Sequence, residues 1–259
     1  MPFETLEIDF NNYKHKKTTI MKRNLLLISN STNPGEEYLG WPRDIIKAFC
    51  ERHGVKEVLF IPYAGVSMGY DKYEERVKGV FATLGLELKS IHRFDNAEKA
   101  VSEAKCIAVG GGNTFHLVAE LYNNNIMDKI AQRAMQGMPY MGWSAGSNIA
   151  GPTLKTTNDM PIIEPKSFDC MNIVPFQINP HYTDYFDPKH GGETRDDRLS
   201  EFQVLNPNMY IAGIREATAL LLENNNLSLI GRDNKMKVFK GNQTPIEYSL
   251  NDDINFLMK

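Results

Sequence analysis

Short runs rich in apolar residues recur along the first half of the chain. They occupy residues 25–29, 58–62, 88–94, 106–109 and 140–143. Most of these runs show no regular alternation with polar residues, which is typical of strands buried on both faces of a parallel sheet. The pattern therefore predicts five mostly parallel strands.

Between these runs, apolar residues recur at helical spacing. The recurring positions are Ile45, Ile46 and Phe49, and then Tyr73, Val77, Phe81 and Leu84. Gly54 and Gly85 follow these two segments, where glycine commonly ends a helix. Alternating strands and helices require crossover connections with helices on both faces of the sheet. We therefore predict a doubly wound α/β fold with a mostly parallel sheet.

The pattern changes after residue 215. Short strand-like segments at 218–222, 227–230, 235–239 and 247–250 are separated by asparagine and glycine. This spacing favours a C-terminal antiparallel ribbon at the edge of the same domain. Residues 1–20 are charged and precede the first strand signal, so we expect a flexible N-terminal extension followed by one domain over 21–259.

Composition narrows the functional classes. The formal net charge is -3, so the chain lacks the concentrated positive charge of nucleic-acid-binding proteins. Cys50, Cys106 and Cys170 are widely spaced and form no CxxC pair, which argues against a disulfide framework or a zinc cluster. The first twenty residues contain no apolar core of a signal peptide, and no stretch approaches the ~20 apolar residues of a membrane span. We expect a cytoplasmic protein that binds neither nucleic acid nor membrane and needs no metal or cofactor.

Residues 142–146 spell GWSAG, a GxSxG motif directly after a predicted strand. In such a motif the flanking glycines leave room for a tight turn from strand to helix, and the serine hydroxyl projects from the sheet edge. A glycine–serine turn of purely structural role is the alternative reading of a bare match. The position after a strand favours Ser144 as a nucleophile.

A second glycine-rich loop, GGGNT at 110–114, follows the strand at 106–109. Its successive backbone N–H groups can face a developing negative oxygen, and such loops also bind phosphate. The loop lacks the GK[ST] ending of a P-loop and the GxGxxG of a dinucleotide fold. We therefore expect Gly111 and Gly112 to form an oxyanion site together with the amide of Ala145.

A serine nucleophile requires a base, normally a histidine that is held by a carboxylate. Among the six histidines, the choice is between His116 and His181. His116 follows the glycine loop and is expected to face inward from a first helical turn. His181 ends the strand-like run 176–180, which Pro180 is expected to halt. We favour His181 as the base. The candidate acids are Asp159, Asp184 and Glu216. Asp159 would give the α/β-hydrolase order Ser, acid, His, whereas Glu216 would give Ser, His, Glu, so the acid stays open.

Several multi-residue motifs, taken in order, closely resemble peptidase E, the aspartyl dipeptidase family. They are GGGNTFHL at 110–117, GWSAGSN at 142–148, TTNDMPI at 156–162, FQINPHYTD at 176–184 and GETR at 192–195. The resemblance implies a flavodoxin-like sheet related to class I glutamine amidotransferase domains. It also implies a serine peptidase that cuts dipeptides with an N-terminal aspartate through an acyl-enzyme.

Carried over by position, the resemblance implies a triad of Ser144, His181 and Glu216. It implies that Asp159 lines the site and that Arg195 grips the carboxylate of the substrate. A guanidinium can hold a carboxylate through two parallel hydrogen bonds. The alternative for Arg195 is a surface ion pair with Glu193 or Asp196.

We expect the partner to be a small peptide substrate and the protein to be a monomer or a homodimer. Two other functions fit the same motifs. The chain could be a related serine hydrolase acting on another aspartyl peptide or on an ester. It could also be a non-catalytic module that uses the glycine loop to bind an anion.

Overall fold

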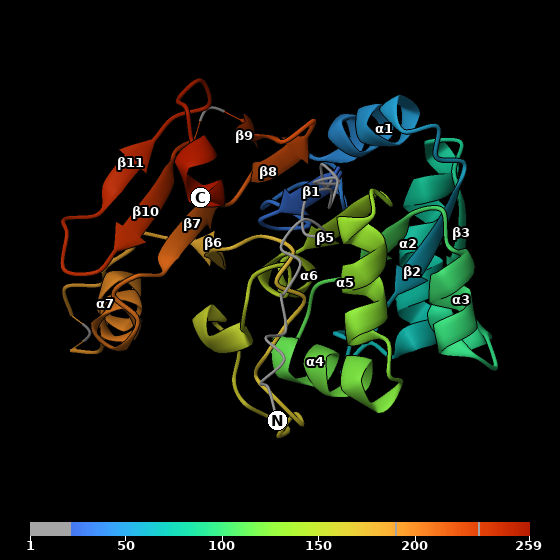
Figure 1. Ribbon diagram of the computed structural model, residues 1–259, viewed down its shortest axis with the longest axis horizontal. Helices are drawn as coiled ribbons and strands as arrows, with labels where there is room; N and C mark the ends of the chain where they lie inside the picture. Colours follow the sequence, from blue (N-terminus) through green and yellow to red (C-terminus); the bar gives the residue numbers. More distant parts are fainter. Residues whose placement is uncertain (1–21, 190, 233) are drawn as a thin grey trace, which may run out of the picture.

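The computed structural model describes residues 22–189, 191–232 and 234–259, so the extension expected at residues 1–20 lies outside the described residues. The chain forms two β-sheets, one of seven strands and one of four. Figure 1 shows them side by side, with most of the helices around the larger sheet.

The larger sheet has the strand order β3-β2-β4-β5-β1-β8-β9. The first five strands in this order are parallel, β8 pairs antiparallel with β1, and β9 pairs antiparallel with β8. The strand bounds are β1 (Leu25–Ile28), β2 (Glu57–Ile61), β3 (Glu87–Ser90), β4 (Ile107–Val109), β5 (Tyr140–Trp143), β8 (Thr218–Glu223) and β9 (Asn226–Gly231). The prediction of a mostly parallel central sheet is confirmed.

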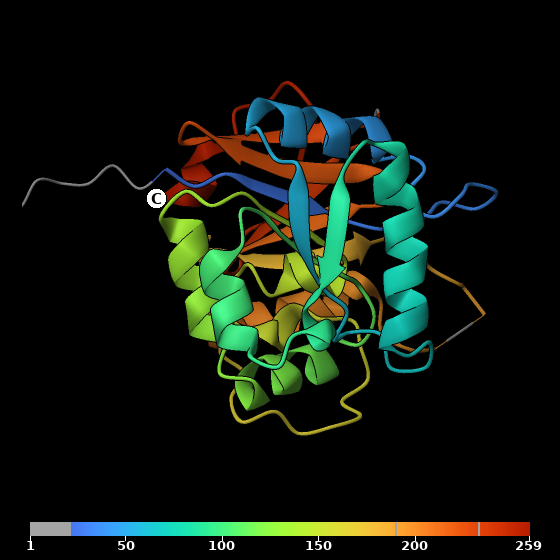
Figure 2. The same cartoon turned by 90° about the vertical axis from the view of Figure 1, so that its right-hand side faces the viewer.

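Helices cover both faces of this sheet. Leu26 and Ile28 pack with α1 (Arg43–Arg52) and α2 (Tyr70–Thr83) in one apolar core. Leu25 and Leu27 point the other way, into a second core that α3 (Ala97–Glu103), α4 (Thr114–Asn123) and α5 (Met127–Met135) close. Figure 2 shows α2 along one side of the strands and the green helices along the other. Burial on both faces explains the continuous apolar runs.

Gly54 and Gly85 have φ values of +64° and +72°, directly after the C-caps of α1 and α2, as predicted. The expected strand at 88–94 is shorter than predicted. β3 ends at Ser90, and a 3-10 turn, η2 (Ile91–Arg93), follows. Its polar side chains His92 and Arg93 bond to acidic residues of α2, which favours the turn over further sheet pairing.

The smaller sheet has the order β11-β10-β7-β6 and is mostly antiparallel. Its strands are β6 (Gln177–Tyr182), β7 (Tyr210–Arg215), β10 (Met236–Lys240) and β11 (Ile246–Tyr248). The antiparallel pairing expected near the C-terminus is confirmed, but its strands are divided between the two sheets. β8 and β9 extend the larger sheet because Leu220, Leu222 and Leu227 are buried in its core, whereas β10 pairs with β7.

One helix, α7 (Arg195–Leu205), packs on the smaller sheet through Leu199, which contacts a small cluster of Tyr182, Ile211 and Phe239. Figure 1 shows α7 below this sheet, away from the other helices. Shorter helical segments are α6 (Ala145–Asn148), η3 (Leu154–Thr156) and η4 (Asn255–Met258). Within the described ranges, every helix is too short or too polar to cross a lipid bilayer.

Candidate active site

Ser144 lies at the turn between β5 and α6 with φ +54° and ψ -113°, an unusual backbone conformation for a residue with a side chain. Its flanking glycines are required by close backbone contacts. A Cβ on Gly142 would lie 2.3 Å from the Gly146 carbonyl oxygen, and a Cβ on Gly146 would lie 2.2 Å from the Val109 oxygen. The predicted tight turn at GxSxG is therefore confirmed, and it places Ser144 at the carboxyl end of the parallel sheet.

The loop after β4 lies directly against this serine. A Cβ on Gly111 would approach the Ser144 Cβ to 2.9 Å, and Gly112 has φ +139° and touches the backbone of Ala64. Within the described part of the chain, the N–H groups of Gly111 and Gly112 donate no hydrogen bond to a protein acceptor. The amide of Ala145 opens α6 and has no intrahelical acceptor. The three amides expected to bind an oxyanion thus stay free on two segments beside the serine.

His181 lies in β6, which Pro180 does not end. β6 is an edge strand of the smaller sheet, where a missing N–H donor is tolerated. The strand instead has a register shift between Asn179 and Tyr182, and His181 has φ +53°. Its backbone N–H donates to the Ser29 hydroxyl at 2.9 Å. A bulge of this kind redirects a side chain that regular pairing would aim elsewhere.

The imidazole of His181 pairs with Glu216. Nδ1 lies 2.8 Å from the Oε1 atom of the carboxylate, and both side chains are partly exposed. Asp184, by contrast, accepts from Arg215 and Tyr182. Of the three candidate acids, the structure therefore places Glu216 beside the base. When Nδ1–H donates to Glu216, Nε2 is left to accept a proton from a serine.

The serine turn and the histidine strand meet at one cavity. Ser144 and His181 both line a space of about 460 Å³. Its other walls are uncharged: Ser31, Tyr38, Ala64, Gly65, Val66, Ser67, Met68, Tyr73, Gly111, Gly112 and Asn113. A small substrate in this space would contact the hydroxyl, the imidazole and the glycine loop together.

Comparison with known proteins identifies the family. The model of "Peptidase family S51" matches residues 25–230. Peptidase E of Nostoc sp. is 47% identical over 239 residues, which cover 92% of this chain and 98% of that protein. The chain belongs to peptidase family S51. Peptidase E of Shewanella sp. strain MR-4 is 44% identical over the same length, 92% of this chain and 100% of that protein.

A solved structure has a similar fold. The crystal structure of a peptidase from an acI-B1 Actinobacterium has a TM-score of 0.66 to this chain at 20% sequence identity. The match covers 90% of this chain and 97% of that chain. It confirms the expected α/β architecture.

In the S51 peptidase, Asp159 accepts hydrogen bonds from two threonines near the glycine loop. Its Oδ2 atom accepts from the Thr114 backbone N–H at 2.7 Å, from the Thr114 hydroxyl at 2.6 Å and from the Thr157 hydroxyl at 3.0 Å. Because Thr114 is the first residue of α4, these bonds tie the TTNDMPI segment to the end of the glycine loop. Among the described residues, Asp159 therefore bonds to the end of the glycine loop and not to His181, whose Nδ1 atom faces Glu216.

Arg195 starts α7 and lines a smaller cavity of about 210 Å³ with Lys237 and Asp196, separate from the cavity of Ser144. Neither ion pair considered for it is the one formed, since Glu193 pairs with Arg198 and Asp196 pairs with Lys237. Its Nη1 atom is buried without a hydrogen-bond partner among the described residues. Burial and the nearby Arg198 lower the pKa of the guanidinium. Such a guanidinium can still donate hydrogen bonds to a carboxylate.

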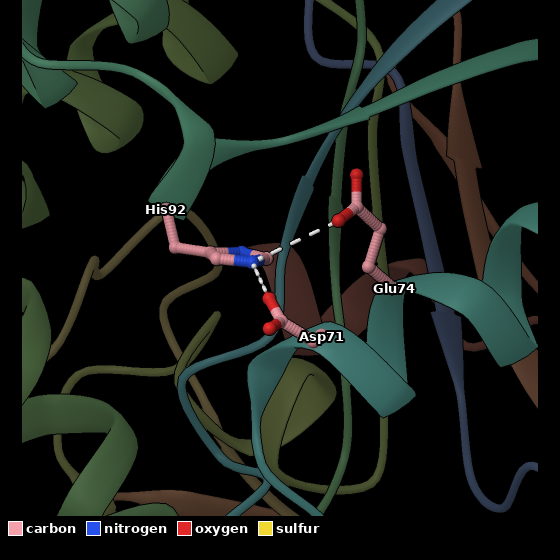
Figure 3. A group of neighbouring side chains, drawn as sticks. All are labelled: Asp71, Glu74 and His92. Carbon is pink, nitrogen blue, oxygen red and sulfur yellow. Dashed lines mark hydrogen bonds and ion pairs between the residues drawn. The ribbon is translucent and has the colours of Figure 1, made fainter.

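The remaining histidines of the S51 peptidase near these elements have structural partners. Nδ1 of His116 lies 2.6 Å from the carbonyl oxygen of Tyr63, which agrees with the predicted inward orientation. His92 lies 2.9 Å from Asp71 and 3.7 Å from Glu74, as Figure 3 shows. Arg93 pairs with both of these carboxylates, so the two acidic groups already have a cationic partner in the protein.

Two supporting residues were not predicted as part of the site. Ser29, read as the end of a strand, accepts from the His181 backbone and donates to the Ile214 carbonyl at 2.8 Å, which links the two sheets. Tyr73, read as an apolar position of a helix, donates its hydroxyl to Gly111. The hydroxyl group of each residue was the available signal in the sequence. The groups that bond to these hydroxyls lie far away in the chain, so local spacing did not reveal the contacts.

Proposed function

We propose that this S51 peptidase is a serine dipeptidase that hydrolyses dipeptides with an N-terminal aspartate. The observation that carries the proposal is the arrangement of Ser144 and His181 on one cavity, with Glu216 bonded to the far nitrogen of the imidazole. Curated relatives named peptidase E, at 44–47% identity, support a peptidase activity.

In the proposed reaction, His181 Nε2 takes the proton of the Ser144 hydroxyl as Oγ attacks the scissile carbonyl carbon. The carbonyl oxygen becomes an oxyanion that accepts from the free amides of Gly111, Gly112 and Ala145. Collapse breaks the C–N bond, and the imidazolium gives its proton to the leaving amine. Glu216 orients the ring and stabilises its charged form.

The resulting acyl-enzyme is an ester between Ser144 and the aspartyl residue. A water molecule gives a proton to His181 and attacks the ester carbon, and the same amides bind the second oxyanion. Return of the proton to Ser144 releases free aspartate. Both half-reactions use the same base and the same oxyanion site.

Selectivity for aspartate is proposed to come from Arg195. The support is its buried Nη1 atom without a partner and its position at the start of α7, which the segment 183–194 connects to β6 and His181. A guanidinium can bind the aspartyl carboxylate through two hydrogen bonds. The uncharged walls of the main cavity supply no other cation for this purpose.

A panel of dipeptides with Asp, Glu, Asn or Ala first, and a common second residue, tests the proposal. We expect the aspartyl dipeptide to be cleaved fastest, and Ser144→Ala to lower that rate by at least about a thousandfold. Wild-type protein should also be labelled at Ser144 by a serine-reactive phosphonate. Equal cleavage of all four dipeptides would contradict the selectivity, and undiminished turnover by Ser144→Ala would contradict the nucleophile.

A further inference from the structure

Several hydrogen bonds from outside the glycine loop hold it beside Ser144, and three of them flank or contact the peptide group between Gly111 and Gly112. Gly110 N–H donates to Ile61 at 3.0 Å, and Asn113 N–H donates to Ala64 at 2.9 Å. Between these two backbone bonds, the Tyr73 hydroxyl donates to the carbonyl oxygen of Gly111 at 2.9 Å. The Tyr73 bond is therefore the side-chain contact that fixes the peptide group between Gly111 and Gly112.

The direction of this bond is determined by its neighbours. The indole Nε1–H of Trp143, which can only donate, lies 3.1 Å from the Tyr73 hydroxyl oxygen and 3.0 Å from that of Tyr38, so its hydrogen is shared between the two tyrosines. The Gly111 carbonyl can only accept, so Tyr73 accepts from Trp143 and donates to Gly111. Tyr38 also donates to Tyr73, at 3.2 Å. Burial raises the pKa of Tyr73, so its hydroxyl keeps the proton that it donates.

Two glycines make room for the tyrosine. A Cβ on Gly110 would lie 2.5 Å from the Tyr73 hydroxyl oxygen, and a Cβ on Gly65 would lie 2.6 Å from its ring. Tyr73 itself is almost fully buried. The first glycine of the GGG run is thus needed for contact with Tyr73, whereas the second packs on Ser144.

We propose that Tyr73 is a positioning residue for the oxyanion site. In a trans peptide, the carbonyl and the following N–H point in opposite directions. The bond from Tyr73 to the Gly111 carbonyl therefore turns the Gly112 N–H away from Tyr73 and toward the space beside Ser144. Because Trp143 immediately precedes Ser144, the chain Trp143–Tyr73–Gly111 also connects the nucleophile turn to the oxyanion loop. This role rests on the proposed function of the site.

The experiment compares Tyr73→Phe with wild type on an aspartyl dipeptide and on an aspartyl aldehyde, whose adduct with Ser144 places an oxyanion in the same site. Loss of one oxyanion donor costs about 10²–10³ in kcat, so a misoriented donor is expected to lower kcat about 10- to 100-fold. KM should change by about twofold or less, because the ground-state carbonyl gains little from this site. Aldehyde affinity should fall in parallel with kcat/KM. A structural role alone would not produce this split.

Tyr122→Phe is the matched control, because its hydroxyl also donates to a backbone carbonyl, that of Asp169, away from the cavity. We expect its kinetics to equal wild type. Gly110→Ala tests the same bond from the loop side and should also lower kcat and aldehyde affinity. Unchanged kcat in Tyr73→Phe, or a rise in KM alone, would overturn the role of Tyr73 while wild-type activity persists. A wild-type protein that neither cleaves the dipeptide nor binds the aldehyde would overturn the proposed function itself.

Discussion

Nδ1 of His181 lies 2.8 Å from Oε1 of Glu216, although 35 residues separate them in the chain. The contact forms because β6 and β7 are neighbouring parallel strands, in which Tyr182 pairs with Arg215. His181 immediately precedes the first of these residues, and Glu216 immediately follows the second. Two neighbouring strands of the smaller sheet therefore bring the proposed base and the proposed acid together.

Glu216→Gln should impair the function of His181 as a base while leaving its imidazole in place. The amide no longer stabilises the imidazolium and can stabilise the wrong tautomer, so we expect kcat to fall by about 10³–10⁴. Steady-state kinetics on an aspartyl dipeptide measure the loss. Glu223→Gln is the matched control, since Glu223 forms a similar pair with His53 at 2.7 Å and lines none of the site. Equal losses in the two variants would rule out a specific role for Glu216.

Arg195→Ala should reduce activity on aspartyl substrates selectively. Loss of a hydrogen-bonded charge pair costs about 1.5–3 kcal/mol, which corresponds to a fall in kcat/KM of roughly 10- to 150-fold. The alanyl dipeptide should lose about threefold or less, because it has no side-chain carboxylate. Arg198→Ala on the same helix, whose partner is Glu193, should leave both substrates unaffected. The selectivity role fails if Arg195→Ala weakens both substrates alike.

Asp159→Ala should destabilise the protein, because it leaves the Thr114 amide and hydroxyl without their acceptor and removes one of two acceptors from the Thr157 hydroxyl. We expect the free energy of unfolding to fall by about 1–3 kcal/mol, measured by urea denaturation. Asp169→Ala, at an exposed position in the same connection between η3 and β6, should change it by about 0.5 kcal/mol or less. Unchanged stability with lost aspartyl selectivity would instead assign Asp159 to the substrate.

The start of α7 depends on a capping box, in which Thr194 and Asp197 bond each other's backbone N–H groups. Thr194→Ala should lower the free energy of unfolding by about 1 kcal/mol. The exposed Ser200→Ala on the same helix should not destabilise the protein, because alanine has the higher helix propensity.

This effect should depend on pH. Hydrogen bonds from Thr194 lower the pKa of Asp197 in the folded protein. A depressed folded pKa gives stability that is present above the unfolded value, about 3.9, and lost as the pH falls through the folded value. The difference in unfolding free energy between wild type and Thr194→Ala should therefore be largest near neutral pH and shrink below about pH 4. A difference that grows on acidification would contradict this account.

The local pattern predicted most of the parallel sheet, the helix ends at Gly54 and Gly85, and the turn at Ser144. It failed where a distant contact decided the outcome. Pro180 does not end β6, because that strand lies at an edge where no partner needs the missing N–H. β8 to β11 read alike in sequence but belong to two sheets, because their partners are β1 and β7.

The sequence by itself determined the types of groups at the site: a serine on a glycine-flanked turn, a glycine loop with free amides, and a short set of histidines and acids. These follow from local sterics and from side-chain chemistry. Only the tertiary structure decided which groups meet. It brought His181 and Ser144 to one cavity, set Glu216 rather than Asp184 beside the proposed base, and bonded Asp159 to Thr114 at the end of the glycine loop. Strand pairing, bulges and buried hydrogen bonds join residues that are far apart in the chain. Local sequence spacing therefore cannot predict these contacts.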